Sequence, residues 1–220
     1  MTGPAPRRIG VFGGTFDPIH RGHLEPLEEA RQGLGLDAVV FVPAFVPPHK
    51  PAGPSASAFH RFAMAAMAIA PYPAFFLSDF EVERGGTTYT VETLRHFRAN
   101  FPGTSVLLLL GSDSLLTFPT WRAWREILEE FALGVVYREG AGLEACQVGL
   151  PPEVTGRFAP VGCRPEDAPE GTSVFWGGNA PVTISSTWIR RAVVAGENLA
   201  GSVPPPVETY LLREGIYRPG

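Results

Sequence analysis

Short runs of consecutive apolar residues alternate along this chain with longer segments in which apolar residues recur every three or four positions. The short runs are typical of strands buried on both faces, and the clearest is Val-Leu-Leu-Leu-Leu at 106–110. We predict strands at 8–12, 38–42, 75–82, 106–110 and 133–137, and a last strand at 173–176.

The longer segments have the spacing of helices. In the first of them Leu24, Leu27 and Ala30 share one face, and Gly33 ends the helix. Pro26 is tolerated there because it falls in the first turn, where its missing N–H would have no partner. We predict helices at 22–32, 59–70, 89–101, 120–131, 185–195 and 207–214.

This alternation of strands and helices predicts an α/β fold, a doubly wound parallel sheet in three α/β/α layers. We find no internal repeat and no linker, and expect a single domain over 1–220 with closing helices at 185–214. In such sheets ligands bind beyond the C-terminal ends of the strands.

Two segments fit neither pattern. Residues 43–58 contain five prolines and predict a long loop, which in a compact domain is usually functional. Residues 139–172 are rich in Gly and Pro and give no clear period.

Composition excludes several classes of protein. Hydrophobic residues make up 45% and charged residues 18%, which is typical of a folded globular chain. A formal charge of −4 argues against a broad nucleic-acid surface, and no apolar run is long enough to span a membrane. No signal-peptide pattern is present, and the two cysteines lack metal-ligand spacing, so we expect a cytoplasmic protein without a metal site of its own.

The most specific string is GGTFDPIHRGH at 13–23, directly after the first predicted strand. Its glycines allow close approach to a phosphate, and His20 and His23 add donors to the free N–H groups of a helix N-terminus. The alternative is a glycine turn followed by two surface histidines. That alternative would suit a single histidine, but it does not account for the whole string.

Two further segments predict anion binding. ISSTWIR at 184–190 leads a helix with three hydroxyls and places Arg190 one turn in. PPHK at 47–50 carries Lys50, the one lysine among 18 basic residues, on the long loop. The alternatives are a serine N-cap beside a surface arginine, and a solvated proline-rich loop.

Three weaker signals concern the rest of a ligand. YTVETL at 89–94 opens a helix whose free N–H groups can hold a carboxylate, although an ordinary hydroxyl cap would look the same. Asp113 follows a strand, where it can accept from ribose hydroxyls or simply form a turn. Of Trp121 and Trp124, one can stack on a flat ring, although both can be core residues.

The string at 13–23 resembles the nucleotidyltransferase signature, a relative of the HIGH motif of class I aminoacyl-tRNA synthetases. The whole set of strings, which also includes GSDSLLTFPTW at 111–121, resembles the bacterial nicotinate-mononucleotide adenylyltransferases. The resemblance runs from Gly13 to Arg190 and includes residues near 212–218, but nothing is recognised over 139–172. Arg122 departs from the family's usual residue at that place.

The resemblance implies a Rossmann-like nucleotidyltransferase fold and the transfer of the adenylyl group of ATP to nicotinate mononucleotide, giving deamido-NAD and pyrophosphate in NAD biosynthesis. It implies catalytic roles for His20, His23, Lys50 and Arg190. It implies that ATP is bound by Gly13, Gly14, Thr15, Phe16, His20, His23, Gly111, Asp113, Ser185, Ser186 and Arg190. It implies that nicotinate mononucleotide is bound by His49, Lys50, Thr90, Val91, Trp121 and Arg122.

This reaction needs no general base, because the attacking phosphate oxygen is already ionised. We expect Mg²⁺ to arrive with ATP, and no nucleic acid or membrane as a partner; the sequence gives no oligomeric state. Two alternatives stay open: another enzyme of the superfamily, such as phosphopantetheine adenylyltransferase or a cytidylyltransferase, and a noncatalytic nucleotide sensor on the same fold.

Overall fold

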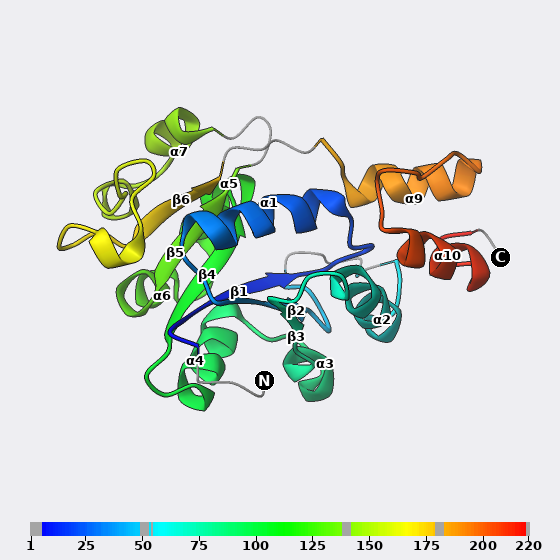
Figure 1. The fold of residues 1–220 in the computed structure, drawn as a ribbon, viewed down its shortest axis with the longest axis horizontal. Coiled ribbons are helices and arrows are strands. Elements are labelled where there is room, and N and C mark those ends of the chain that lie inside the picture. The colour runs from blue at the N-terminus through cyan, green and yellow to red at the C-terminus, as the bar shows by residue number, and fades with distance from the viewer. Residues whose placement is uncertain (1–5, 49–52, 54, 138–141, 179–182, 219–220) are drawn as a thin grey trace. The chain divides into compact units, whose positions relative to one another are not determined.

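The computed structural model describes residues 6–48, 53, 55–137, 142–178 and 183–218. The strands form one six-stranded sheet in the order β3-β2-β1-β4-β5-β6 (Figure 1). The strands are β1 Arg8–Gly14, β2 Ala38–Pro43, β3 Phe75–Leu77, β4 Ser105–Gly111, β5 Ala132–Val136 and β6 Val174–Gly178. The helices are α1 Arg21–Gly33, α2 Ala58–Ile69, α3 Phe80–Arg84, α4 Thr90–Asn100, α5 Ser112–Thr117, α6 Trp124–Glu130, α7 Leu143–Gly149, α8 Pro152–Thr155, α9 Ser186–Ala195 and α10 Pro205–Arg213, with short 3₁₀ turns η1 Phe118–Thr120 and η2 Pro165–Asp167.

The sheet has the strand order of a doubly wound fold. β1 pairs with β4, β4 with β5 and β5 with β6, and all three pairs are parallel. The chain runs from β1 to β2 on one side and later returns to β4 on the other, so the order reverses between β1 and β4. The predicted fold class is confirmed, and the reversal lies where such sheets bind ligands.

The chain divides into two compact units that interleave in sequence. The first unit comprises residues 1–12, 26–40 and 89–181, and the second comprises residues 13–25, 41–88 and 182–220. The prediction of a single domain over 1–220 stays a prediction.

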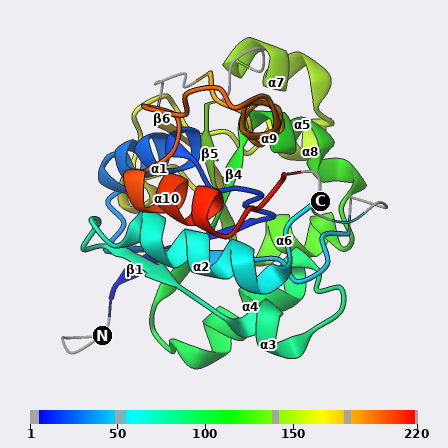
Figure 2. The ribbon, with the colours of Figure 1, turned by 90° about the vertical axis from the view of Figure 1, so that its right-hand side faces the viewer.

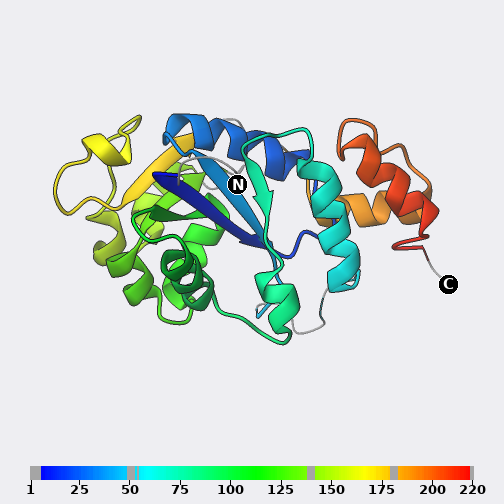
Figure 3. The same ribbon diagram turned by 60° about the horizontal axis from the view of Figure 1, so that its bottom comes forward.

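In the first unit, β4 is the centre of the core. It is buried from Val106 to Gly111, which explains its unbroken aliphatic sequence. The later part of α1 packs closely on one face, since a Cβ added to Gly177 would lie 2.9 Å from the Cβ of Ala30. Helices α4 and α6 pack on β4 and β5 from the other face (Figure 1, Figure 3).

In the second unit, α2 packs against both β3 and α10 (Figure 2). Ser57 caps α2, its side chain accepting from the N–H of His60 at 3.2 Å. The ring of His60 also forms a 2.8 Å hydrogen bond with the Tyr210 hydroxyl on α10. The last helix is thereby tied to α2.

Most predicted elements are confirmed to within a residue or two, but the strand predicted at 75–82 is wrong beyond Leu77. The N–H of Ser78 donates to Phe41 O, and the Ser78 hydroxyl then accepts from the N–H of Phe80. Serine and aspartate at 78–79 are residues that begin helices, so the chain turns into α3 despite the apolar residues that follow.

The helix predicted at 120–131 is also corrected. Residues 118–120 form the 3₁₀ turn η1, Trp121 is extended, and Ala123 adopts a left-handed φ of 56° before α6 begins at Trp124. The two tryptophans therefore do not share a helix face. The residues that follow β4 form the short helix α5, and the segment 139–172, which showed no period, contains α7 and α8.

No helix among the described residues has both the length and the apolar character that crossing a bilayer requires.

Candidate functional site

The loop at 13–23 in the second unit is shaped by its glycines and by one buried ring. A Cβ added to Gly14 would lie 2.7 Å from the ring of Phe16, so only glycine fits there. Phe16 itself has a left-handed φ of 51° and is 2% exposed, with its ring against Phe41 and edge-on to His23. The Phe16 ring is therefore part of the core.

His20 and His23 lie together at the start of α1, with ring centroids 3.8 Å apart. The N–H of His20 donates to Nδ1 of His23 at 3.3 Å. Because Nδ1 accepts, a neutral His23 ring carries its proton on Nε2. His20 is buried at 2% exposure, whereas His23 is partly exposed.

Asp17, within the same string, is a buried carboxylate that the sequence analysis did not select. It is 2% exposed and accepts from the backbone N–H groups of Ser55 at 2.7 Å and Ala56 at 3.0 Å. It also accepts from the hydroxyl of Tyr217 at 2.7 Å. Burial, and then the Asp17 charge, raise the pKa of the Tyr217 phenol above its ordinary value, so this hydroxyl stays protonated and donates.

Arg61 on α2 is a second charged group in this interior, and its side chain is fully buried. It donates to three backbone carbonyls: Thr15 at 2.7 Å, Phe45 at 2.9 Å and Ala56 at 3.2 Å. Burial lowers the pKa of Arg61, and the charge of Asp17 opposes that shift. Arg61 thus joins the loop at 13–23 to both ends of the proline-rich segment at 43–58.

The sequence carried a signal for Arg61 that we did not use. Arg61 follows Ala58 by three positions and precedes Ala65 by four, and both alanines are buried. This spacing places an arginine on the apolar face of a helix, where a charge persists only with partners. Tyr217 gives no comparable local signal.

The start of α9 lies against the loop at 13–23. The Ser185 side chain accepts from the N–H of Trp188 at 3.2 Å, so Ser185 is the N-cap. The Ser186 hydroxyl donates to Pro18 O at 3.0 Å. Of the two predicted phosphate-binding serines, Ser185 therefore caps α9, and the Ser186 hydroxyl joins α9 to the loop through its bond to Pro18 O.

Arg190 reaches from α9 to the same loop. Its Nη1 donates to the main-chain oxygen of Asp17 at 2.7 Å and lies 3.9 Å from the carboxylate Oδ2, while Nη2 donates to Thr187 Oγ1 at 3.3 Å. Its side chain is 26% exposed. The second unit therefore brings Arg190 beside the string that contains His20 and His23.

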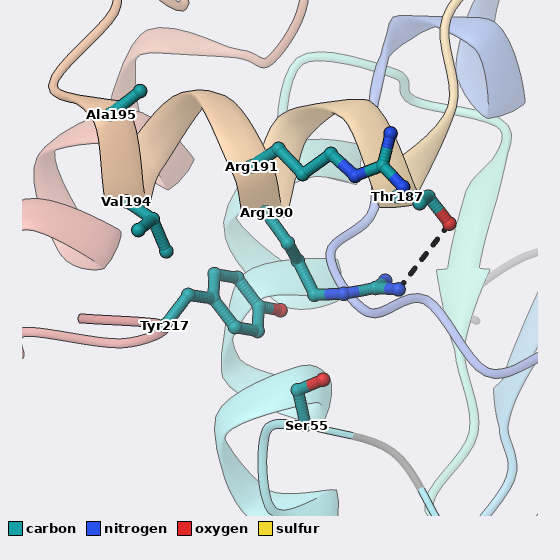
Figure 4. Close-up of a pocket in the computed structure, with 7 residues that line it drawn as sticks. All are labelled: Ser55, Thr187, Arg190, Arg191, Val194, Ala195 and Tyr217. Carbon is teal, nitrogen blue, oxygen red and sulfur yellow. Dashed lines mark hydrogen bonds between the residues drawn. The ribbon is translucent and has the colours of Figure 1, made fainter. Parts of the chain in front are cut away.

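Arg190 lines a pocket of about 490 Å³ within the second unit. Figure 4 shows the Arg190 side chain between Tyr217 and Thr187, with Ser55 on the opposite wall. The lining consists of Ser55, Thr187, Arg190, Arg191, Val194, Ala195 and Tyr217. Two arginines and three hydroxyls give this pocket the chemistry of an anion site.

The first unit holds the other predicted ligand residues. The guanidinium of Arg122 lies 4.5 Å from the centre of the Tyr89 ring, directly before α4. Glu92 accepts from the N–H of Tyr89 at 3.0 Å, and the helix ladder offers no acceptor for the N–H groups of Thr90 and Val91. The structure thus brings the Trp121–Arg122 pair together with the helix start that was predicted to hold a carboxylate.

Trp121 and Trp124 differ in their surroundings. Both rings are edge-on to Phe118, with centroids at 5.7 and 6.0 Å. Trp124 is buried, at 9% exposure, whereas Trp121 is partly exposed. Only Trp121 offers ring surface to a ligand.

The remaining predicted residues lie on the loop at 13–23 and at the end of β4. Gly111 ends β4 and is the N-cap of α5, and the exposed Asp113 accepts from the N–H of Ser114 at 2.9 Å. Gly13 is exposed and Gly14 and Thr15 are half-buried on the loop. His49 and Lys50 lie outside the described residues. Among those residues, no three His, Cys, Asp or Glu side chains form a group that could hold a metal ion.

Comparison with known proteins adds the evolutionary context. A cytidylyltransferase-like family model matches residues 11–192. Proteins named probable nicotinate-nucleotide adenylyltransferase are 38% identical to this chain in Pelobacter propionicus and 39% identical in Neisseria meningitidis serogroup B. Each alignment covers 96% of this chain and 98% of the relative.

Solved structures agree on the fold. The Plasmodium falciparum nicotinic acid mononucleotide adenylyltransferase complexed with NaAD has a TM-score of 0.72 at 18% identity and covers 96% of this chain and 97% of that one. The same enzyme complexed with APC gives a TM-score of 0.70. With matched sequences over almost its full length, this chain belongs to the cytidylyltransferase-like family, among the nicotinate-nucleotide adenylyltransferases.

Proposed function

We propose that this chain transfers the adenylyl group of ATP to nicotinate mononucleotide, giving deamido-NAD and pyrophosphate in NAD biosynthesis. Similarity over almost the full chain to proteins named probable nicotinate-nucleotide adenylyltransferase supports nicotinate mononucleotide as the acceptor. The observation that carries the chemistry is the convergence of His20, His23 and Arg190 on one loop, at the start of α1.

The reaction asks for charge neutralisation rather than proton abstraction. The nucleophile is an ionised phosphate oxygen, and negative charge moves from the α-phosphorus toward the departing pyrophosphate. His20 and His23 would donate to the phosphates at the α1 N-terminus, and Arg190 would hold the outer phosphates. Lys50 would add a point charge from the proline-rich loop.

We infer that Mg²⁺ enters this site bound to the phosphates of ATP. Mg²⁺ usually keeps several waters and binds substrate phosphates together with one or two carboxylates. Among the described residues, no cluster of carboxylates could enclose the ion. Asp113 is an exposed carboxylate among the residues predicted to bind ATP. Bound Mg²⁺ would neutralise phosphate charge, and the chain's own part would be to position the nucleotide.

The first unit would supply the specificity for the acceptor. The nicotinate carboxylate would meet the N–H groups of Thr90 and Val91 at the start of α4, near the Arg122 guanidinium. The exposed part of Trp121 would stack on the pyridine ring. We place the reaction in the cytoplasm, consistent with two cysteines that form no disulfide.

The substrate pair is the first test. We expect nicotinate mononucleotide to exceed nicotinamide mononucleotide in kcat/KM by roughly 5- to 150-fold, because an amide NH₂ facing backbone donors leaves about 1–3 kcal/mol of hydrogen bonding unsatisfied. Pyrophosphate release with ATP measures it. Phosphopantetheine with ATP, and CTP with an alcohol phosphate acceptor, should be inactive. Equal efficiency with both pyridine nucleotides would refute the carboxylate site, and no turnover with either would refute the function.

His23→Ala tests the phosphate donors. Loss of a positioned donor to developing charge reduces turnover by roughly 100- to 1,000-fold. We expect that loss in kcat with a normal circular dichroism spectrum. The matched control is His96→Ala on α4, outside the site, which should turn over normally. A folded His23→Ala protein as active as the control would contradict the assignment.

Trp121→Ala and Trp124→Ala separate stacking from packing. Loss of ring stacking should raise KM for nicotinate mononucleotide by about 3- to 10-fold and leave KM for ATP unchanged. Trp124 is a core residue, so its removal should lower the free energy of unfolding by about 3–5 kcal/mol while KM values stay normal. Steady-state kinetics and urea unfolding of both variants check this, and exchanged phenotypes would show that the assignment is wrong.

A further inference from the structure

The hydrogen-bond donors around the Asp17 carboxylate are all neutral groups. Oδ1 accepts from the hydroxyl of Tyr217 and the N–H of Ala56, and Oδ2 accepts from the N–H of Ser55. These donors come from segments about 40 and 200 residues away in sequence. A carboxylate at 2% exposure requires such donors, because it has almost no access to water.

Arg190 stands beside this carboxylate but does not form a close ion pair with it. Nη1 is 2.7 Å from the main-chain oxygen of Asp17 and 3.9 Å from Oδ2. Guanidinium groups ordinarily take carboxylates with two parallel hydrogen bonds. Here Oδ1 already accepts from two donors and Oδ2 from the N–H of Ser55, and Arg190 is oriented by two neutral oxygens, Asp17 O and Thr187 Oγ1.

The hydroxyl of Tyr217 is the side-chain member of that donor set, and its placement is specific. Tyr217 has a left-handed φ of 72°, a conformation that a non-glycine residue keeps only where its surroundings hold it. The ring lines the same pocket as Arg190, and Figure 4 shows the phenol directed toward that arginine. The hydroxyl therefore lies between the pocket and the carboxylate.

We propose that Tyr217 is a positioning residue: by occupying Asp17 Oδ1, it prevents Arg190 from closing onto the carboxylate and keeps the guanidinium directed at a polyphosphate in the pocket. The proposal rests on the proposed function, since the polyphosphate is that of ATP. Without the hydroxyl, one lone pair of Oδ1 is left to Arg190, which then exchanges its backbone contact for a paired contact with Asp17. The Asp17 carboxylate then neutralises the charge of Arg190, and Arg190 binds phosphate with lower affinity.

Tyr217→Phe tests this with Tyr210→Phe as its matched control. Each change removes one hydroxyl from the C-terminal segment, but the Tyr210 hydroxyl bonds to His60 and not to Asp17. For Tyr217→Phe we expect roughly a tenfold rise in the dissociation constant of ATP with Mg²⁺ by calorimetry, since hydrogen bonds to charged groups contribute at about that level. KM for ATP should rise equally, and KM for nicotinate mononucleotide should not change. Tyr210→Phe should bind ATP normally.

A double variant with Arg190→Ala and Tyr217→Phe distinguishes a positioning role of Tyr217 from a general loss of local order. If Tyr217 acts through Arg190, adding Tyr217→Phe to Arg190→Ala should weaken ATP no further. Additive losses, equal losses in both tyrosine variants, or an unchanged ATP affinity in Tyr217→Phe would each overturn the proposal.

Direct ATP binding also separates this proposal from the function. A parent chain that binds ATP but releases no pyrophosphate with nicotinate mononucleotide would refute the acceptor and leave Tyr217 testable. A parent chain with normal turnover and a Tyr217→Phe variant with normal ATP affinity would refute only the role of Tyr217. A parent chain that does not bind ATP would overturn both.

Discussion

A buried carboxylate organises the second unit. Asp17 lies where water is almost absent, so its charge must be satisfied by the chain itself. It accepts hydrogen bonds from Ser55, Ala56 and Tyr217. Arg61 adds a buried positive charge and donates to carbonyls that include those of Thr15 and Ala56. The loop at 13–23, the segment after the proline-rich stretch and the C-terminus are thus held together by polar contacts rather than by apolar packing alone.

This arrangement has a consequence for catalysis. A site that works through electrostatic stabilisation is effective only if its donors are already in place before charge develops. His23 receives a contact that fixes its tautomer, and Arg190 is fixed by the backbone of the residue that carries the buried carboxylate. The same hydrogen bonds that satisfy a buried charge therefore also fix the groups that would meet phosphate.

The sequence predicted the parts of the fold in which local pattern and burial agree. The aliphatic run of β4 and the glycine-flanked α1 are found where the pattern predicted them, because β4 is buried on both faces and α1 buries one stripe. Residues 78–84 escaped prediction because a serine and an aspartate redirect an otherwise apolar segment into α3. The left-handed Ala123, which separates Trp121 from Trp124, gives no pattern at all.

The residues of the candidate site also fall into those that the sequence predicted and those that it did not. The strings at 13–23 and 184–190 could be selected because their residue types suit phosphate, and the structure places them side by side. Tyr217 could not be selected, since its partner is 200 residues away and its neighbours are ordinary C-terminal residues. Contacts of that range depend on tertiary packing, such as that of α2 against α10, which no local pattern describes.

The free energy of unfolding of Asp17→Asn tests the role of this carboxylate most directly. An asparagine keeps the shape but turns an NH₂ group toward backbone donors and removes the charge that faces Arg61. Denaturant unfolding, with the exposed Asp167→Asn as control, should show a loss of about 2–4 kcal/mol for Asp17→Asn and under about 0.5 kcal/mol for the control. An Asp17→Asn protein as stable as the control would show that the buried carboxylate does not organise the second unit.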